Sequence, residues 1–442
     1  MKNKYASLIL LGVMLLALPG FAQQELTLHL LDNVYQATHT NPAFRTRSNK
    51  INVTIFSSAH LSLRNSGFTY NQLAANIKED ETGQRIIDLQ DVQDNLNLNG
   101  RDYVHASFNA DLFALSFPAG KNRFSLNVTE HIQGRLHYDA SILELATTGN
   151  APGQTFQFGN YELNAIHFRE FGIGWNRPFL EENKLTVGTR LKAVFGLGNI
   201  QTQYADVSLT TGTEQELYAI TTNANVRANT SGVDMLEDDL EAYLFNLQNV
   251  GFGIDIGGTY ELNNQISFSA SVINLGMISW QEDAKAYTSE GEFTFTGVDN
   301  DDLLTEGFDI DIEQLTDSIA DVFDLEEEEA QYTTGLPTQM YLTGNYQLAR
   351  RTTASATLYS DFYRSFRRGF ALGIRQNVGR WLQAAATYSV QNRSFNNLGA
   401  GLSLTTGPGG IQLYCATDNI LALTSIGGAR VANMRAGFNF VF

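Results

Sequence analysis

The sequence contains little cysteine and no long hydrophobic run. Cys415 is the single cysteine of the 442 residues, so an internal disulfide is excluded, and we interpret it as a small apolar residue of a strand. After residue 22, no stretch carries 18 consecutive apolar residues. A membrane-spanning helix needs about 20 such residues, so none is expected in that part of the chain.

Motifs of catalysis and cofactor binding are missing as well. The chain has no G-x-S-x-G, no H-E-x-x-H and no Walker-type loop. Its 7 histidines are scattered, and His131 and His137 would share one face of a strand. Polar side chains that point into a lumen explain this pair better than the site of a hydrolase. We therefore expect that the protein is not an enzyme and that it holds no cofactor and no metal centre.

Residues 1–22 have the features of a secretory signal peptide. Lys2 and Lys4 give a positive start, an apolar run extends from Leu8 to Leu18, and Gly20-Phe21-Ala22 is a small-x-small cleavage pattern. The apolar run is shorter than a membrane-spanning helix. A retained N-terminal anchor is the alternative.

Basic residues are scarce in the remaining chain. The 29 Lys and Arg face 47 Asp and Glu, and the net charge of −18 becomes −20 once Lys2 and Lys4 leave with the signal peptide. Nucleic acid is not expected as a partner, because phosphate binding needs clustered Lys and Arg. In contrast, 38 Gly, 18 Tyr and 28 Phe are typical of barrel walls and their aromatic girdles.

Long segments in which apolar and polar residues alternate are the main positive signal. Arg190 and Lys192 lie on the polar face of one such segment, 185–197, and Asp255 and Glu261 on that of another, 250–262. These segments exceed the five or six residues of an average strand and match the roughly 9–11 residues of a tilted membrane strand. We expect an all-β fold, a transmembrane antiparallel β-barrel in the bacterial outer membrane. The four charged residues would point into its lumen, since a basic residue facing lipid costs about 2–4 kcal/mol.

The pattern leaves the strand number open between 14 and 16. Sixteen segments qualify, but the regions 199–230 and 284–297 could instead form hairpins outside the membrane. With both termini in the periplasm, most short turns fall on the periplasmic side and the links 138–162, 298–336 and 419–431 fall outside. The long 231–249 link and the short 263–264 turn fall on the wrong sides. One strand in the middle is therefore miscounted.

The last segment of the chain has one apolar face. It carries Met434, Ala436, Phe438, Phe440 and Phe442 on that face, and the sequence stops on the phenylalanine. A period of two over nine residues predicts a strand. Phe438, Phe440 and Phe442 resemble the signal that the barrel assembly machinery recognises. A soluble sheet that happens to end on phenylalanine is the alternative.

Two polar regions could serve binding. The insertion 298–336 is rich in Asp and Glu, has no Lys or Arg, and predicts a short amphipathic helix from Ile312 to Phe323. A solvated loop outside the cell explains it better than a divalent-cation site. An aromatic and basic turn, 359–370, could bind phosphates of lipopolysaccharide through its arginines or belong to an ordinary girdle.

Two short motifs carry a family resemblance. Asn41-Pro42-Ala43-Phe44 precedes the first strand, and Ala416-Thr417-Asp418-Asn419-Ile420-Leu421 lies near the end. The layout resembles an uncharacterised family of outer-membrane barrels (a domain of unknown function) from gliding-type bacteria. It is also similar to long-chain fatty-acid-transporter-like barrels and to accessory barrels of type IX secretion and gliding motility.

The resemblance implies that residues 23–50 form a plug or hatch inside a barrel of residues 51–442. Asn41 and Pro42 would shape the turn that leads from the plug into the first strand. Transport of a small hydrophobic or amphipathic compound across the outer membrane is the first function implied. The alternative is a structural or docking barrel for secretion, gliding motility or surface-protein attachment.

Overall fold

The computed structural model describes most of the predicted barrel and the segment ahead of it. The described residues are 25–45, 50–67, 69, 71–72, 77–79, 85–87, 102–138, 141, 144–145, 149–159, 161–214, 219–295, 326–363, 367–379, 381–391, 394–407 and 410–442. The predicted signal peptide and the predicted helix within 298–336 lie outside them. No helix in these ranges is long and apolar enough to cross a membrane.

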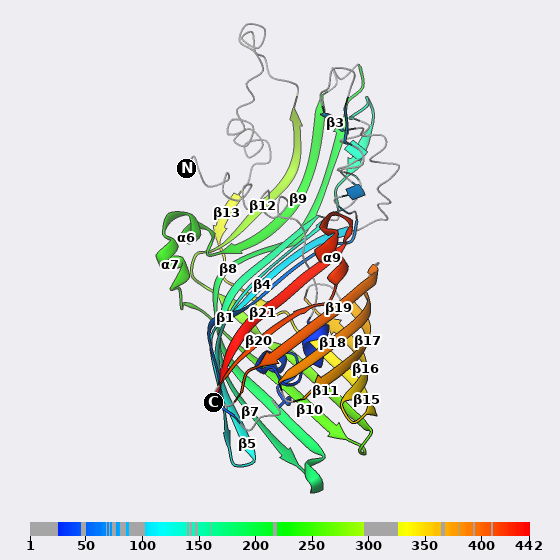
Figure 1. The fold of residues 1–442 in the computed structure, drawn as a ribbon. Coiled ribbons are helices and arrows are strands. Elements are labelled where there is room, and N and C mark those ends of the chain that lie inside the picture. Colours follow the sequence, from blue (N-terminus) through cyan, green and yellow to red (C-terminus); the bar gives the residue numbers. More distant parts are fainter. Residues whose placement is uncertain are drawn as a thin grey trace.

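Fourteen antiparallel strands close into a barrel, which confirms the predicted fold class and its lower strand number (Figure 1). The wall strands are β1 (Asn52–Asn65), β4 (Asp102–Ala119), β5 (Asn122–Tyr138), β7 (Glu162–Phe179), β8 (Leu185–Thr211), β10 (Asn249–Glu261), β11 (Ile266–Trp280), β15 (Gln339–Ala349), β16 (Thr352–Asp361), β17 (Arg367–Val378), β18 (Leu382–Gln391), β19 (Ser394–Thr405), β20 (Gly410–Thr417) and β21 (Val431–Val441). Closure comes from β1, which pairs with both β21 and β4.

The wall is apolar outside and polar inside, the reverse of a soluble domain. On β17, Phe370, Leu372 and Ile374 are exposed, whereas Ala371 on the other face is buried. The lumen instead holds buried polar side chains such as Asn439 and Arg435. Such alternation suits a wall with hydrocarbon on one side and a hydrated or plugged interior on the other.

The two ends of the barrel differ. One end, here called the turn end, carries the short connections, for example between β4 and β5, β10 and β11, and β15 and β16. The other end, here called the loop end, carries the long connections, for example between β11 and β15 and between β20 and β21, and also the short one between β18 and β19. Both the first residue of β1 and the last residue of β21 lie at the turn end, because Asn52 pairs with Val441.

A small sheet extends beyond the loop end and explains the miscounted strand. The outer half of β8 pairs with β9 (Ile220–Ser231), β9 pairs with β12 (Ala284–Phe295), and β12 pairs with β13 (Glu326–Glu329). Figure 1 shows these strands rising above the barrel. The predicted strands near 214–229 and 284–297 are therefore hairpin arms outside the wall, so the 263–264 turn lies at the turn end and the 231–249 link at the loop end.

Short elements complete the described chain. They are α2 (Leu26–Leu30), η1 (Tyr35–His39), β2 (Ile77–Glu79), β3 (Arg85–Ile87), β6 (Thr155–Gln157), η2 (Glu181–Asn183), α6 (Val233–Asp238), α7 (Leu240–Leu244), β14 (Tyr332–Gly335), α9 (Ile420–Thr424) and η4 (Ile426–Gly428). Residues 326–336 of the acidic insertion thus contain two short strands, β13 and β14.

One wall strand is short, and α9 lies where it stops. β20 pairs with β19 only from Thr417 to Gln412, so the loop-end part of β19 has no strand partner on that side among the described residues. Helix α9 packs against β19 and β21. Its Ala422 is fully buried, whereas Leu421 and Leu423 are exposed, so the helix continues the apolar outer face of the wall.

Candidate functional site: a plugged lumen

Residues 25–45 lie inside the barrel, where Figure 1 shows them in dark blue. Helix α2 packs against β17, β18, β19 and β20. Leu28, Leu31 and Val34 join Tyr414 and Ala416 in one buried apolar cluster. Leu26 belongs to a second cluster with Tyr341 and Tyr359. The segment therefore fills the lumen with a small apolar core of its own, and we call it the plug.

The side chain of Asp418 holds the start of the plug. Its carboxylate accepts hydrogen bonds from the backbone N–H groups of Leu26 (3.2 Å) and Thr27 (2.6 Å) and from Asn433 Nδ2 (2.9 Å). Burial raises the pKa of Asp418 to about 6, although the bonds from Thr27 and Asn433 oppose that shift. The hydroxyls of Thr27 and Thr387 add a contact of 2.7 Å. Asp418 belongs to the second motif of the sequence, to which no role was assigned.

Asn41 and Pro42 hold the end of the plug. Asn41 Nδ2 donates to the carbonyls of Ala270 (3.3 Å) and Gly258 (3.4 Å), and Pro42 O accepts from Asn176 Nδ2 (3.1 Å). Two glycines of the wall leave space for these contacts, because a Cβ at Gly188 would overlap the Pro42 carbonyl and one at Gly257 would overlap the Asn41 side chain. The predicted turn residues thus contact the barrel wall directly.

Polar side chains also anchor the middle of the plug. Gln36 and Asn439 exchange two amide hydrogen bonds of 2.9 and 3.0 Å. His29 contacts the hydroxyls of Thr40 (2.8 Å) and Thr343 (3.0 Å). Burial, with a smaller contribution from Arg375, lowers the pKa of His29 to about 3, so this side chain is neutral at physiological pH.

Three of the four charged residues expected in the lumen form one buried ion-pair network. Asp255 contacts Lys192 Nζ (2.9 Å) and Arg190 Nη1 (3.3 Å), and Lys192 also contacts Glu170 (3.0 Å). Arg190 donates to Thr38 Oγ1 of the plug at 2.9 Å. Glu261, the fourth, lies apart from them, exposed at the turn end of β10.

A second network binds the first residue of the plug. Arg435 Nε donates to the carboxylate of Glu25, and Arg435 Nη1 lies 3.6 Å from Asp111 Oδ2. Asp111 Oδ1 is 3.1 Å from His39 Nε2. Opposite charges on the wall and the plug are therefore matched. Sequence reasoning missed this network because alternation shows which face a residue is on, but not its partner.

The plug separates two cavities. A small cavity of about 80 Å³ lies on its loop-end side and is lined by Glu25, His60, Arg64, Tyr359 and Asp361, among others. A larger cavity of about 630 Å³ lies on its turn-end side, lined by His29, Phe44, Glu261 and Arg375, among others. Both linings are rich in polar side chains. A compound that crosses the barrel would have to pass the plug.

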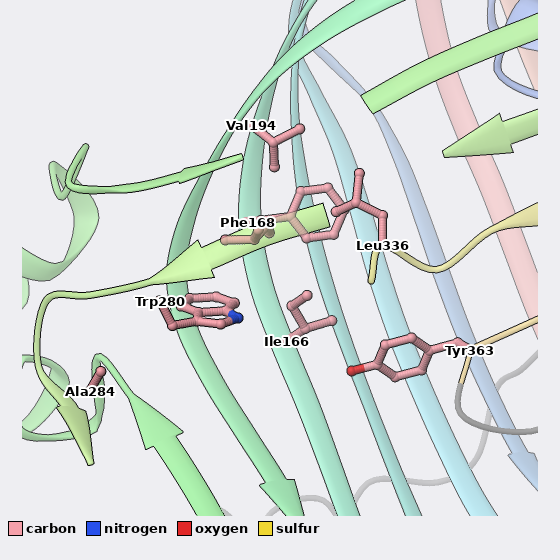
Figure 2. Packing of buried hydrophobic residues seen from close by; sticks show 8 residues of the cluster. Ile166, Phe168, Val194, Trp280, Ala284, Leu336 and Tyr363 are labelled. Carbon is pink, nitrogen blue, oxygen red and sulfur yellow. The ribbon is translucent and has the colours of Figure 1, made fainter. Parts of the chain in front are cut away.

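An apolar cluster fills part of the lumen at the loop end (Figure 2). It contains Ile166, Phe168, Val194, Ile278, Trp280, Ala284, Leu336 and Tyr363. In Figure 2, Tyr363 approaches this group from the opposite side of the view to Trp280. Arg135 lies over the Tyr363 ring, 5.6 Å from its centroid. The loop-end layer of the lumen is thus apolar on one side and cationic on the other.

The outer wall has an apolar hollow of its own near α6. Its volume is about 540 Å³, and Ile132, Ala165, Ile200, Val233 and Leu236 are among its lining residues. Beside it, Glu130 pairs with Arg169 (2.8 Å) and His167 (3.0 Å), and Arg169 Nη1 donates to Leu244 O of α7. The helices α6 and α7 thereby cover charges that lie on the outer face of the wall.

Other residues predicted from the sequence have these places. Phe438 and Phe440 are half-buried on β21, and Phe442 is exposed; their rings contact each other in sequence. In the aromatic and basic turn, Phe362 and Phe370 are exposed, but Tyr359, Tyr363 and Arg367 are buried in the lumen. The surface interpretations of that turn therefore do not hold for these three residues. Arg364 and Phe366 lie outside the described residues.

The fold and the docked segment define a closed, plugged β-barrel. The chain belongs to the family described as Family of unknown function (DUF5723), whose model matches residues 42–418. The resemblance to an uncharacterised barrel family is thereby confirmed, whereas the links to gliding motility and type IX secretion stay predictions. None of the curated proteins matches the chain significantly.

The chain is similar, at low sequence identity, to several solved structures. The toluene transporter TbuX of Ralstonia pickettii is 11% identical, with 96% of this chain and 98% of that chain covered and a TM-score of 0.44. A Pseudomonas aeruginosa FadL homologue is 11% identical (96% and 97% covered, TM-score 0.44). The Pseudomonas putida toluene transporter TodX is 9% identical (96% and 98% covered, TM-score 0.41).

Proposed function

We propose that this protein is an outer-membrane barrel that passes a small amphipathic compound when its plug moves. The observation that carries the proposal is the plug itself, which separates the 80 Å³ and 630 Å³ cavities. Hydrogen bonds hold it to the wall: Asp418 accepts from the Thr27 N–H, and the plug residues Asn41 and Gln36 donate to wall groups. Such bonds exchange readily with water, so a plug held in this way can be released more easily than a wall strand.

Locking the plug tests this function. The hydroxyls of Thr27 and Thr387 are 2.7 Å apart, so Thr27→Cys with Thr387→Cys in a Cys415→Ser background places two thiols side by side. We expect liposomes with the reduced protein to take up octyl sulfate, and oxidation to reduce uptake at least tenfold. Thr27→Cys alone in the same background is the control. Equal uptake by the oxidised and reduced double variant would contradict passage through the lumen.

Docking of a partner at the cell surface is the second candidate. It is favoured by the sheet beyond the loop end, where Glu326 to Glu329 of β13 are all exposed. This sheet is not needed to close the barrel. If it docks a partner, replacing these four glutamates by glutamine should abolish a reproducible cross-link to one surface protein on intact cells and leave octyl sulfate uptake unchanged.

The location is testable independently of either function. An outer-membrane barrel should fractionate with the outer membrane and migrate faster on gels before boiling than after it. Recovery in the soluble periplasmic fraction would contradict both candidate functions.

A further inference from the structure

Three arginines lie together in the lumen at the loop end, outside the networks that hold the plug. They are Arg64 of β1, Arg135 of β5 and Arg367 of β17, with exposed fractions of 6%, 1% and 4%. The positive charge of Arg367 acts on both Arg64 and Arg135. We call this group the arginine cluster.

Within the part of the chain that the structure describes, Asp361 is the carboxylate that pairs with members of the cluster. Asp361 Oδ2 lies 2.6 Å from Arg367 Nη2 and 3.8 Å from Arg135 Nη2. Asp102, next to Tyr103 on β4, is also buried. Its carboxylate accepts from Ser66 Oγ at 2.7 Å, and its side chain lies on the opposite face of β4 from His105, which lines the lumen. Since arginine stays protonated in proteins, the cluster keeps two positive charges in excess of Asp361.

The cluster also has hydrogen-bond donors without acceptors. Within the described ranges, Arg64 Nε and both Nε and Nη1 of Arg367 have no hydrogen-bond partner. The Arg367 guanidinium lies over the Tyr103 ring at 5.6 Å, which fixes its position without satisfying these donors. Buried charges are expensive unless they are paired and hydrogen-bonded. The plug networks obey this rule, as Lys192 shows with its two carboxylates.

There is space for a counter-ion beside the cluster. Of the three arginines, Arg64 lines the cavity of about 80 Å³, together with Asp361, Tyr359 and His105, whereas Arg135 and Arg367 contact Asp361 but do not line the cavity. A cavity needs roughly 10–15 Å³ of this kind of volume to hold one water molecule. The cavity beside Arg64 therefore has room for several waters or for a small oxyanion. It has no room for a long acyl chain.

We infer that the arginine cluster binds an oxyanion: a phosphate, sulfate or carboxylate group. Guanidinium groups donate to such groups in a planar, often bidentate geometry. Arg64 lines the cavity and has its Nε donor to offer, and Arg367 adds its positive charge beside Asp361. The oxyanion is either free in solution or the headgroup of the transported amphiphile. Only the second source rests on the proposed function. A neutral hydrocarbon would leave the excess charge and the donors unmatched.

Binding can be measured on the full-length protein in neutral detergent, without any transport assay. The probes are inorganic phosphate and octyl phosphate, compared with sodium chloride at equal ionic strength. A ligand that binds only the folded barrel raises Tm with its concentration. We expect both probes to raise Tm, and Arg64→Gln and Arg367→Gln each to weaken binding at least tenfold. Arg227→Gln, on the sheet beyond the barrel where Arg227 pairs with Glu328, is the matched control.

A variant that should strengthen phosphate binding distinguishes a binding defect from a folding defect. Asp361→Asn removes the competing negative charge but keeps an oxygen for the Tyr363 N–H, which is 3.0 Å from Asp361 Oδ1. We expect this variant to bind phosphate several-fold more tightly, which a merely damaged barrel would not do. Tighter binding of octyl phosphate than of phosphate assigns the site to an amphiphile headgroup, and equal binding assigns it to a free oxyanion.

The inference is overturned if neither probe raises Tm relative to sodium chloride. It is also overturned if Arg64→Gln and Arg367→Gln bind phosphate as tightly as the unsubstituted protein, because another part of the chain would then neutralise the cluster. The plug-lock uptake experiment reports on the proposed function separately. Phosphate binding without uptake would contradict transport and leave the oxyanion site standing.

Discussion

Two buried titratable residues, Asp418 on the wall and His29 on the plug, should change the stability of plug docking in opposite directions as pH changes. The pKa of Asp418 is raised by burial from 3.8 to about 6, so the docked state binds the proton more tightly than the released state. The contribution of Asp418 to the stability of the docked plug is therefore largest below about pH 4 and is lost as pH rises through 6. The pKa of His29 is lowered by burial from 6.5 to about 3, so docking through His29 weakens as pH falls below 6.5.

These opposing effects predict a weak pH dependence of plug docking that single substitutions should expose. With Asp418→Asn, hydrogen exchange of the α2 amides should become faster between pH 6.5 and 4, after correction for intrinsic exchange rates, because of these two residues only His29 still responds. With His29→Gln, the same amides should become better protected over that range. The docking constant should change by tenfold or more in each case. Parallel profiles for the two variants would contradict the assignment.

Adjacent glycines of β10 offer a test of the Asn41 contact. A Cβ at Gly257 would overlap the Asn41 side chain, whereas a Cβ at Gly258 would meet Thr186 O at an ordinary 3.7 Å. We expect Gly257→Ala to weaken docking by about 1–3 kcal/mol, as overpacking does elsewhere, and Gly258→Ala to have little effect. Proteolysis of residues 23–50 in the folded barrel measures the release. Equal sensitivity in the two variants would show that the close approach is not needed.

At this scale the sequence indicates faces but not partners. The period of two was enough to expect Arg190, Lys192 and Asp255 on one side of the wall, and the structure has all three buried there. It could not show that Asp255 lies between the other two, because that depends on the register of β8 and β10. Arg367 was assigned to the surface because it follows a turn rich in aromatic residues, and a turn has no fixed alternation.

At the scale of elements, the strands were predictable and their location was not. β9 and β12 alternate like wall strands, and the pattern alone allows 14 or 16 strands. A clue was present in their composition: β9 has only Ile220 and Val226 as large apolar side chains, too few for a continuous lipid-facing stripe. Both strands lie beyond the barrel, where no such stripe is required.

The wall beside the short strand β20 should depend on the contacts of α9. Asn419 Nδ2 donates to the carbonyl of Val431 at 2.7 Å, on the side of β21 where the described pairing with β20 stops at Arg435. Asn419→Ala leaves that buried carbonyl without its donor, a loss of about 1–3 kcal/mol. We expect faster hydrogen exchange in residues 394–399 of β19, next to α9. Leu423→Ala, an exposed change on the same helix, is the control, and an identical exchange pattern in both variants would contradict this role.

At the scale of the molecule, the charge of the lumen differs from that of the chain. The net charge of the whole sequence is −18. Among the described residues, however, basic side chains outnumber acidic ones along the inside of the wall. The basic ones are Arg64, Arg123, Arg135, Arg190, Lys192, Arg367, Arg375 and Arg435, and the acidic ones are Asp111, Glu162, Glu170, Asp255, Glu261, Asp361 and Asp418. Much of the acidity of the chain lies in other parts of the sequence, such as 298–336.

This charge distribution predicts the behaviour of the barrel once the plug is removed. Deleting residues 25–45 removes two acidic residues, Glu25 and Asp32, which pair with Arg435 and Arg375, and one basic residue, Arg45, and so raises the positive excess of the lumen by one charge. We expect planar bilayers with the unmodified protein to show little conductance and those with the deletion variant to show stable, anion-selective channels. Selectivity should weaken as salt rises, because counter-ions screen the wall charges over about 10 Å at 0.1 M and about 3 Å at 1 M.

The sign of the reversal potential in a potassium chloride gradient decides this prediction. Substituting Arg64 and Arg367 with glutamine in the deletion variant should move the reversal potential toward the cation side, because both charges lie inside the barrel. Arg227→Gln, which lies on the sheet beyond the wall, should leave it unchanged. A cation-selective deletion variant would mean that the acidic loops, rather than the basic lumen, set the field that a permeating ion meets. The oxyanion site would then have to be reached against that field, which binding kinetics at low salt would show as a slow association rate.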